Sequence, residues 1–167
     1  MTYQEFVISR VKWLPTVGEN LAHAGMGLLG EVYELEIYDG IKNYLEELGD
    51  VEFYLGHYKQ SLGAYYTGED FVPREEARAI EANPLNALKL HAATLHDFAK
   101  KIWIYQKPIL GLPLTAHIIR TELCLHFLAE NVKKTRQEVQ QINQEKLTKR
   151  YPNGYSDKDA QERKDKQ

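Results

Sequence analysis

The amino-acid sequence predicts an all-α protein, a helical bundle built from one domain. Apolar residues recur at three- and four-residue steps through most of the chain, which is the period of an amphipathic helix. The strand alternation and regularly spaced turn signals that are typical of a β-protein are absent. A chain of 167 residues, 43% of them hydrophobic, is long enough to bury one sizeable core and too short for a second.

Five long helical segments are predicted, separated by recognisable breaks. Pro15 closes the first, the turn at Asp39–Gly40 ends the second, and the segment PILGLPL separates the fourth from the fifth. Residues 63–84 carry two glycines, two prolines and a charged stretch, so we expect a loop with one short helix there. The predicted helices cover residues 6–14, about 21–38, about 41–62, about 85–105 and about 115–150.

The domain is predicted to cover residues 1–151. Beyond it, residues 152–167, PNGYSDKDAQERKDKQ, form a polar tail with almost nothing to bury. A segment of this composition cannot offset the entropy of ordering its backbone, so we expect a flexible C-terminal tail.

Residues 90–132 echo residues 28–58. Both regions read as a pair of amphipathic helices of similar length, but the second lacks most of the acids of the first and keeps Asp97 and Glu122. A degenerate duplication of one helix pair would produce this pattern. Two unrelated amphipathic helix pairs would also resemble each other, so both explanations stay open.

The composition excludes several classes of function. A formal net charge of −3 is too small to indicate a nucleic-acid partner. The N-terminal stretch MTYQEFVISRVKWLP lacks the apolar core of a signal peptide, and no stretch approaches 18 apolar residues, so we expect no membrane association. Cys124 is the only cysteine, which excludes an intramolecular disulfide and favours a reducing compartment such as the cytoplasm.

Four acids form two pairs with the same three-residue step, Glu31 with Glu34 and Glu47 with Asp50. Residues three apart lie within about 60° of each other on a helix surface, so each pair projects from one face. The twelve residues between Glu34 and Glu47 contain the Asp39–Gly40 turn, which lets the two helices run antiparallel. Four carboxylates are therefore predicted to converge across one helix–helix seam.

A bare cluster of this kind is unfavourable, because like charges raise each other's pKa and push the helices apart. A hard divalent cation reverses this: Mg²⁺ and Mn²⁺ prefer oxygen ligands. The acids also flank a buried seam, because their neighbours are the apolar Val32, Leu35, Leu48 and Val51, and the nearby Gly27, Gly30 and Gly49 would allow close backbone approach. The sequence thus predicts a magnesium site, with manganese as the alternative ion.

The alternative is that these acids are solvated on wet faces of their helices. A single acidic pair would favour that interpretation, whereas two pairs flanking one turn favour a metal site. The neighbouring Glu36, Glu46 and Glu52 fall off the predicted faces and are interpreted as solvated.

The pattern Glu31-x-x-Glu34, twelve residues, Glu47-x-x-Asp50 resembles the signature of MazG-like, all-α nucleoside triphosphate pyrophosphohydrolases. The glycine before Glu31, the run Glu-Leu-Gly-Asp and the aromatic residue after it also fit. The resemblance is strongest over about residues 20–60, and DFAKKIWIY and NQEKLTKRYPNGYS resemble phage-type members that are related to dimeric dUTPases. Residues 63–96 have no counterpart in compact members of the family, which leaves the substrate base open.

The resemblance implies magnesium-dependent hydrolysis of a (deoxy)nucleoside triphosphate between its α and β phosphates, giving the monophosphate and pyrophosphate. It also implies a homodimer or homotetramer, which agrees with long helices whose apolar faces exceed what one chain can cover. The four acids would hold the metal, and Glu34 is the candidate general base, because a carboxylate bonded to the attacking water can take its proton.

The phosphates require positive charge as well. Asn143, Lys146 and Arg150 lie at i, i+3 and i+7, which places them on one face of a helix. Dimeric dUTPase-like enzymes close a similar asparagine–lysine–arginine helix over the phosphates. The alternative is a solvated helix end whose cations complement the helix dipole.

Two further groups are candidates for substrate contact. Lys100 and Lys101, beside Asp97, are a second candidate for the phosphates, and a polar rim beside a buried aromatic face is the alternative. Tyr54 and His57, one and two turns beyond Asp50, are candidates for contact with the base.

Three functions stay open. The first is a nucleotide pyrophosphohydrolase that controls a nucleotide pool, in a phage context and hence in the host cytoplasm if a phage encodes it. The second is a dUTPase- or dCTPase-like, pyrimidine-specific enzyme with the same metal core. The third is a non-catalytic helical interaction protein whose acids bind a structural cation or a partner.

Overall fold

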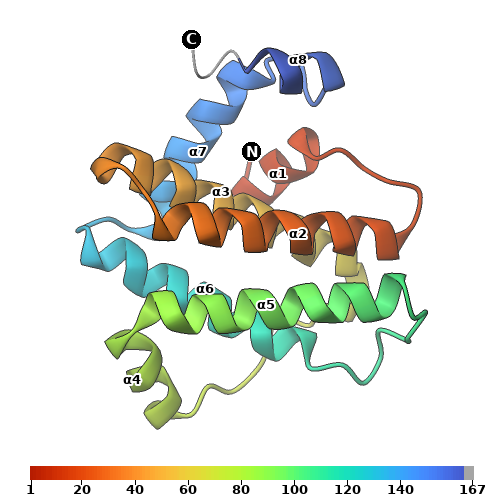
Figure 1. Ribbon diagram of the computed structural model, residues 1–167, viewed down its shortest axis with the longest axis vertical. Coiled ribbons are helices and arrows are strands. Elements are labelled where there is room, and N and C mark those ends of the chain that lie inside the picture. Colours follow the sequence, from red (N-terminus) through yellow and green to blue (C-terminus); the bar gives the residue numbers. More distant parts are fainter. Residues whose placement is uncertain (164–167) are drawn as a thin grey trace.

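The structure, a computed structural model, describes residues 1–163 and confirms the predicted all-α helical bundle (Figure 1). Its described residues contain no β-strand, only an isolated bridge between Pro152 and Gly154. No helix among them is both long and apolar enough to cross a membrane. The helices are α1 (Tyr3–Arg10), α2 (Val17–Glu36), α3 (Gly40–Leu62), the short 3₁₀ helix η1 (Gly63–Tyr65), α4 (Arg74–Ala82), α5 (Pro84–Trp103), α6 (Leu114–Asn131), α7 (Arg136–Arg150) and α8 (Asp157–Glu162).

Four long helices form the centre of the bundle. α2 packs against α3 and α5, and α5 packs against α6. Figure 1 shows α2 and α5 side by side, with α3 behind α2 and α6 behind α5. The smaller helices cover this centre: α4 contacts α5 and α6, while α1 and α7 contact α3 and each other.

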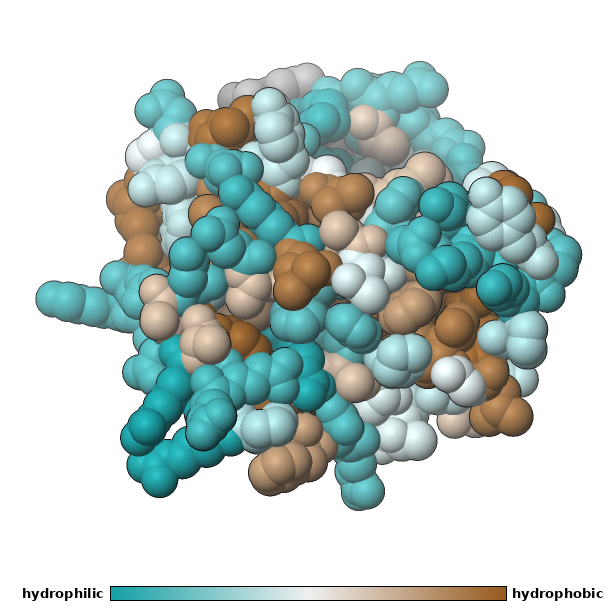
Figure 2. Space-filling model, turned by 60° about the horizontal axis from the view of Figure 1, so that its bottom comes forward, coloured by the Kyte–Doolittle hydropathy of each residue, from teal (hydrophilic) through white to brown (hydrophobic). Residues whose placement is uncertain are grey.

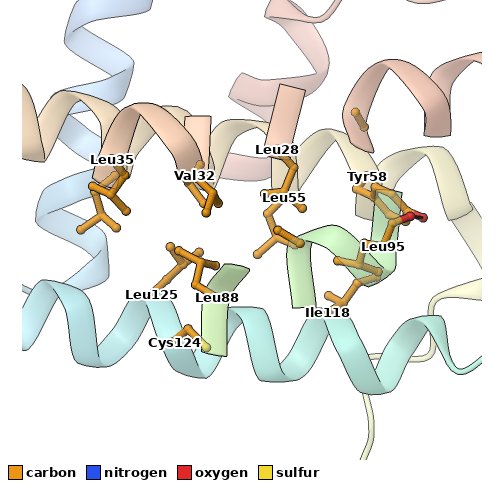
Figure 3. Close-up of a cluster of buried hydrophobic side chains, with 14 of the residues drawn as sticks. Leu28, Val32, Leu35, Leu55, Tyr58, Leu88, Leu95, Ile118, Cys124 and Leu125 are labelled. Atoms are coloured by element: carbon orange, nitrogen blue, oxygen red, sulfur yellow. Dashed lines mark hydrogen bonds between the residues drawn. The ribbon is translucent and has the colours of Figure 1, made fainter. Parts of the chain in front are cut away.

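The core lies where the central helices meet (Figure 3). Leu28, Val32 and Leu35 occupy one face of α2 at the helical period, and they point toward Leu88 of α5 and Leu55 of α3. Burying a leucine contributes about 1.5–3 kcal/mol relative to leaving it exposed. This shared core therefore holds α2 firmly against both neighbours and gives the acids of α2 and α3 a rigid support.

The prediction of a single helix over residues 115–150 is wrong, because the structure has two helices there. α6 ends at Asn131, and Lys133 follows in a left-handed conformation with a φ of +56°. Thr135 then caps α7: its side chain accepts a hydrogen bond from the Glu138 N–H, and the Glu138 carboxylate accepts one from the Thr135 N–H. The break lets α7 lie against α3, which bears two of the predicted metal ligands.

The chain beyond Tyr151 buries more than its composition indicated. α8 forms within the predicted tail, and Tyr155 and Ala160 pack against a small second core. That second core consists of Phe6, Leu147 and Tyr151. Figure 1 shows α8, the end of α7 and α1 gathered at one end of the molecule. Residues 164–167 of the predicted tail lie outside the described residues, and the flexibility of the tail stays a prediction.

Candidate metal centre and adjoining cavity

The turn between α2 and α3 sets the two acidic pairs opposite each other. α2 ends at Glu36 and α3 begins at Gly40, whose φ of +77° is a conformation that glycine adopts at little cost. Asn43 supports the turn, because its side chain accepts a hydrogen bond from the Asp39 N–H at 2.9 Å. The Asn43 amide also donates to Oε1 of Glu47 at 2.5 Å, which orients that carboxylate.

Three of the four predicted ligands come together. One carboxylate oxygen each from Glu31, Glu34 and Glu47 lies within 4.8 Å of the other two. Glu47 is buried, with 5% of its surface exposed, whereas Glu34 is exposed. The group is thus anchored in the seam on one side and open to solvent on the other. Carboxylate oxygens in this arrangement are a donor set that fits a hard divalent cation.

Asp50 lies beside this group with partners of its own on α7. Its Oδ1 accepts a hydrogen bond from Nδ2 of Asn143 at 2.7 Å, and its Oδ2 forms an ion pair with Lys146. Asn143 is fully buried, and its Oδ1 accepts a hydrogen bond from the Tyr3 hydroxyl at 2.9 Å. Two of the three predicted phosphate contacts are therefore gathered on Asp50.

The electrostatics of the group favour a cation. Burial, together with the charges of Asp50, Glu34 and Glu47, raises the pKa of Glu31 to about 8, while Lys146 acts in the opposite direction. Burial also raises the pKa of Asp50, against the lowering effect of Lys146. In the absence of metal, Glu31 thus keeps its proton to a higher pH than an ordinary glutamate does, and a bound divalent cation would displace that proton.

The glycines near the acids play different roles. A Cβ on Gly49 would lie 2.9 Å from Cβ of Asn143, so this glycine lets α7 approach α3 closely, as predicted. A Cβ on Gly27 would lie 2.2 Å from the ring of Tyr54. The prediction of close approach is wrong for Gly30, because a Cβ there would meet nothing within 4 Å.

A cavity of about 250 Å³ adjoins the carboxylates, and Glu31 and Asp50 form part of its wall. Its remaining wall comes from α1, α2, α3, α7 and the chain around α8, and it includes Arg10, His23, Tyr54, His57, Arg150 and Tyr155. Lys149, the neighbour of Arg150, lies instead in a shallow surface depression of about 810 Å³ that contains none of the predicted metal ligands. The cavity, although smaller, is therefore the candidate substrate site.

Two histidines of this cavity have buried ring nitrogens without partners. His57 is completely buried, and neither its Nδ1 nor its Nε2 has a hydrogen-bond partner. Nδ1 of His23 is in the same situation, and the two ring centroids lie 5.0 Å apart. The spacing of His57 from Asp50 marks it in the sequence, whereas nothing in the local sequence marks His23 or Arg10 as part of a site.

The two lysines that are the second candidate for phosphate contact have an acidic partner on their own helix. Lys100 and Lys101 pair with Asp97 at 3.0 and 2.6 Å, and their helix passes the first half of α2, where Gly25 lies against His96. The structure does not bring these lysines to the carboxylates.

The interpretation of Glu52 as solvated is wrong, since 3% of its surface is exposed. Its carboxylate binds the Arg136 guanidinium through two bonds of 2.5 and 2.8 Å. Glu36 pairs with Lys89, and Glu46 lies 3.9 Å from Lys42. Cys124 is buried in the core, where burial raises the pKa of its thiol to about 12.

Comparisons of this chain with protein families, with curated protein sequences and with solved structures found no match. The resemblance to MazG-like enzymes therefore rests on the acidic motif and its spacing, and it stays a hypothesis.

Proposed function

We propose that this protein is a magnesium-dependent, MazG-like nucleoside triphosphate pyrophosphohydrolase. The observation that carries the proposal is the convergence of Glu31, Glu34 and Glu47, whose oxygens lie within 4.8 Å of one another beside a cavity. Like charges held this close favour a divalent cation, and the spacing of the acids resembles that of enzymes that cleave triphosphates with magnesium. The proposal includes a cytoplasmic location, in the host if a phage encodes the protein.

Each residue of the site has a role in this reaction. Glu31, Glu34 and Glu47 would hold magnesium, or manganese in its place. Bound magnesium would spread the charge of the phosphates and lower the pKa of the attacking water. Glu34 is exposed, so its carboxylate can reach that water and take its proton. The water oxygen bonds to the α-phosphorus, the bond to the α–β bridging oxygen breaks, and pyrophosphate leaves with that electron pair.

The α7 residues supply positive charge and positioning. Lys146 is paired with Asp50, and Arg150 lines the cavity one turn further along the helix. Ammonium and guanidinium groups neutralise phosphate well, the latter through two parallel bonds. Both ends of the Asn143 amide are already bonded within the protein, so its role in this proposal is to position Asp50 rather than to touch the phosphates.

The proposal also includes a homodimer or homotetramer. Large apolar side chains are exposed on α2, α3 and α5, among them Met26, Tyr33, Ile41 and Leu90. Figure 2 shows one face of the molecule on which hydrophobic residues reach the surface between hydrophilic ones. Pairing with a second copy would cover such residues. Light scattering that finds only monomers at micromolar concentration would contradict this part of the proposal.

The test is release of pyrophosphate from a panel of ribo- and deoxyribonucleoside triphosphates with Mg²⁺ or Mn²⁺. We expect at least one triphosphate to yield its monophosphate and pyrophosphate in equal amounts, and a chelator to stop the reaction. A panel that includes dUTP and dCTP also tests the pyrimidine-specific alternative. The absence of turnover on every member would contradict the proposal and favour the non-catalytic interaction protein.

A further inference from the structure

The cavity beside the carboxylates contains a buried histidine whose hydrogen-bonding atoms are unused. His57 is 0% exposed, and both of its ring nitrogens lack a partner. Such atoms are rare in proteins, because an unpaired buried donor or acceptor costs about 1–3 kcal/mol. Since His57 lines the same cavity as Glu31 and Asp50, a ligand bound there can provide the missing partners.

His23 extends this polar surface. Burial lowers the pKa of His23, while the backbone of Lys12 acts in the opposite direction. Nδ1 of His23 is buried and has no hydrogen-bond partner, so its capacity to form a hydrogen bond is unused. The rings of His23 and His57 meet edge to face, so their unpaired atoms lie in one region of the cavity.

The chemistry of these atoms selects an uncharged ligand. Burial lowers the pKa of His57 to about 3, and His23 adds to the effect, so the ring is neutral at physiological pH. A neutral imidazole offers one N–H donor and one lone pair, which suit a planar ring that carries both an acceptor and a donor. Phosphate, in contrast, would find no cation at His57. Tyr54 in the same wall supplies an aromatic surface for such a ring.

We infer that this cavity binds the base of the nucleotide and that His57, together with His23, determines which base is accepted. The inference rests on the proposed function, which places the phosphates at the Glu31 and Asp50 wall of the same cavity. The base then lies deeper, where its polar edge forms hydrogen bonds with the two histidines. A base whose donors and acceptors do not match leaves His57 unpaired and is rejected.

The experiment measures binding of free nucleosides, which need neither metal nor turnover. Trp13 reports on the cavity, because its ring packs edge to face against His57 at 5.4 Å. In a Trp103→Phe background Trp13 is the only tryptophan of the chain, and its fluorescence is titrated with uridine, thymidine, cytidine, adenosine and guanosine. We expect saturable binding with a preference of about tenfold or more for some nucleosides over others.

Variants of His57 connect this preference to its ring nitrogens. His57→Phe keeps an aromatic ring of similar size. It should raise the Kd of the preferred nucleoside about tenfold or more and so remove the differences in Kd between the nucleosides. His57→Gln keeps a donor and an acceptor and should retain part of the preference. The matched control is His126→Phe, since His126 lies on α6 at the surface, 3.4 Å from Glu130, and should leave the panel unchanged.

The outcomes separate the inference from the proposed function. No nucleoside binding, or a His57→Phe panel identical to the wild-type panel, overturns the inference even if pyrophosphate is released from triphosphates. Nucleoside binding that depends on His57 without any turnover overturns the proposed function and leaves the inference standing. If circular dichroism shows that His57→Phe does not fold, His23→Phe is measured against the same control and judged by the same outcomes.

Discussion

Two helix pairs, α2–α3 and α5–α6, contribute to one core, yet the acidic cluster of the first pair has different neighbours from the acids of the second. On α5, Asp97 pairs with Lys100 and Lys101, and on α6, Glu122 binds Lys59 at 2.7 Å. On α2 and α3, by contrast, Glu31, Glu34 and Glu47 lie next to one another, with one carboxylate oxygen of each within 4.8 Å of the other two. The nearby Lys146 is already paired with Asp50.

This difference separates acids that are paired with a cation of the protein from acids that lie next to other acids. An acid whose cation comes from within the protein is stabilised without any ligand. Carboxylates that are packed together and partly buried raise each other's pKa, and they reach their lowest free energy only with a bound cation. The α5–α6 pair is thus the internal control for the α2–α3 pair, whether or not the two pairs arose by duplication.

The largest expected effect comes from neutralising the acids of each pair. Glu31→Gln, Glu34→Gln, Glu47→Gln and Asp50→Asn should each lower turnover about 10³-fold or more while circular dichroism shows an intact fold. Asp97→Asn and Glu122→Gln, the matched changes on α5–α6, should leave turnover within about threefold, because these acids only balance lysines. Equal turnover of both sets of variants in the pyrophosphate assay would contradict the difference between the acids of α2–α3 and those of α5–α6.

A smaller effect tests the cations beside the acids. Arg150→Ala removes a guanidinium from the wall of the cavity and should lower kcat/KM about 10²-fold, the scale of a lost charge-stabilising donor. Lys149→Ala removes an exposed cation about 100° further round α7, outside the cavity, and should be close to silent. Metal binding without substrate should not change in either variant. Equal losses in both would show that this helix end is only a charged surface.

The sequence could predict the α2–α3 pair because its signals are local. Apolar period, the Asp39–Gly40 turn and the three-residue steps together place Glu31, Glu34 and Glu47 on facing helices. The sequence also contains a signal for the start of α7, because Thr135 and Glu138 form the same capping-box pattern as Thr16 and Glu19. Apolar residues continue at helical steps through the break, so the periodicity alone predicts one continuous helix.

What the sequence could not predict depends on contacts between distant residues. Glu52 reads as a solvated acid until α7 brings Arg136 to it across 84 positions of the chain. Asp50 is bound by Asn143 and Lys146 from the same helix. His23 and His57 likewise become a pair only when α2 packs on α3. Spacing along one helix carries no information about such partners.

The pH dependence of stability should differ between the two pairs. Burial, with Asp50, Glu34 and Glu47, raises the pKa of Glu31 from 4.5 to about 8, so between these values the folded state holds a proton that the unfolded state has released. Stability of the metal-free protein should therefore fall as pH rises from about 4.5 to about 8. The pKa of Asp97, in contrast, is lowered by its bonds to Lys101 and Lys100, and it adds nothing in this direction.

Thermal unfolding in a chelator measures this effect. The Tm of the wild-type protein, compared with that of Glu31→Gln, should drop by about 4 °C or more between pH 5 and pH 8. Saturating Mg²⁺ should remove most of the drop, because the metal replaces the proton on Glu31. A wild-type curve parallel to the Glu31→Gln curve would show that Glu31 titrates as an ordinary surface acid.

The smallest effect concerns two glycines three residues apart on the acidic helix. A Cβ at Gly27 would lie 2.2 Å from Cε1 of Tyr54, whereas a Cβ at Gly30 would meet nothing within 4 Å. Gly30→Ala should therefore stabilise the protein by about 0.4–1 kcal/mol through helix formation alone. Gly27→Ala gains the same helical preference but must displace the Tyr54 ring, and such overpacking costs about 1–3 kcal/mol.

Urea unfolding should show a lower midpoint for Gly27→Ala and a higher one for Gly30→Ala. Because Tyr54 lines the cavity next to Glu31, only Gly27→Ala should also weaken nucleoside binding. Equal midpoints would mean that the Tyr54 ring moves freely and does not form a fixed wall between the acids and the base.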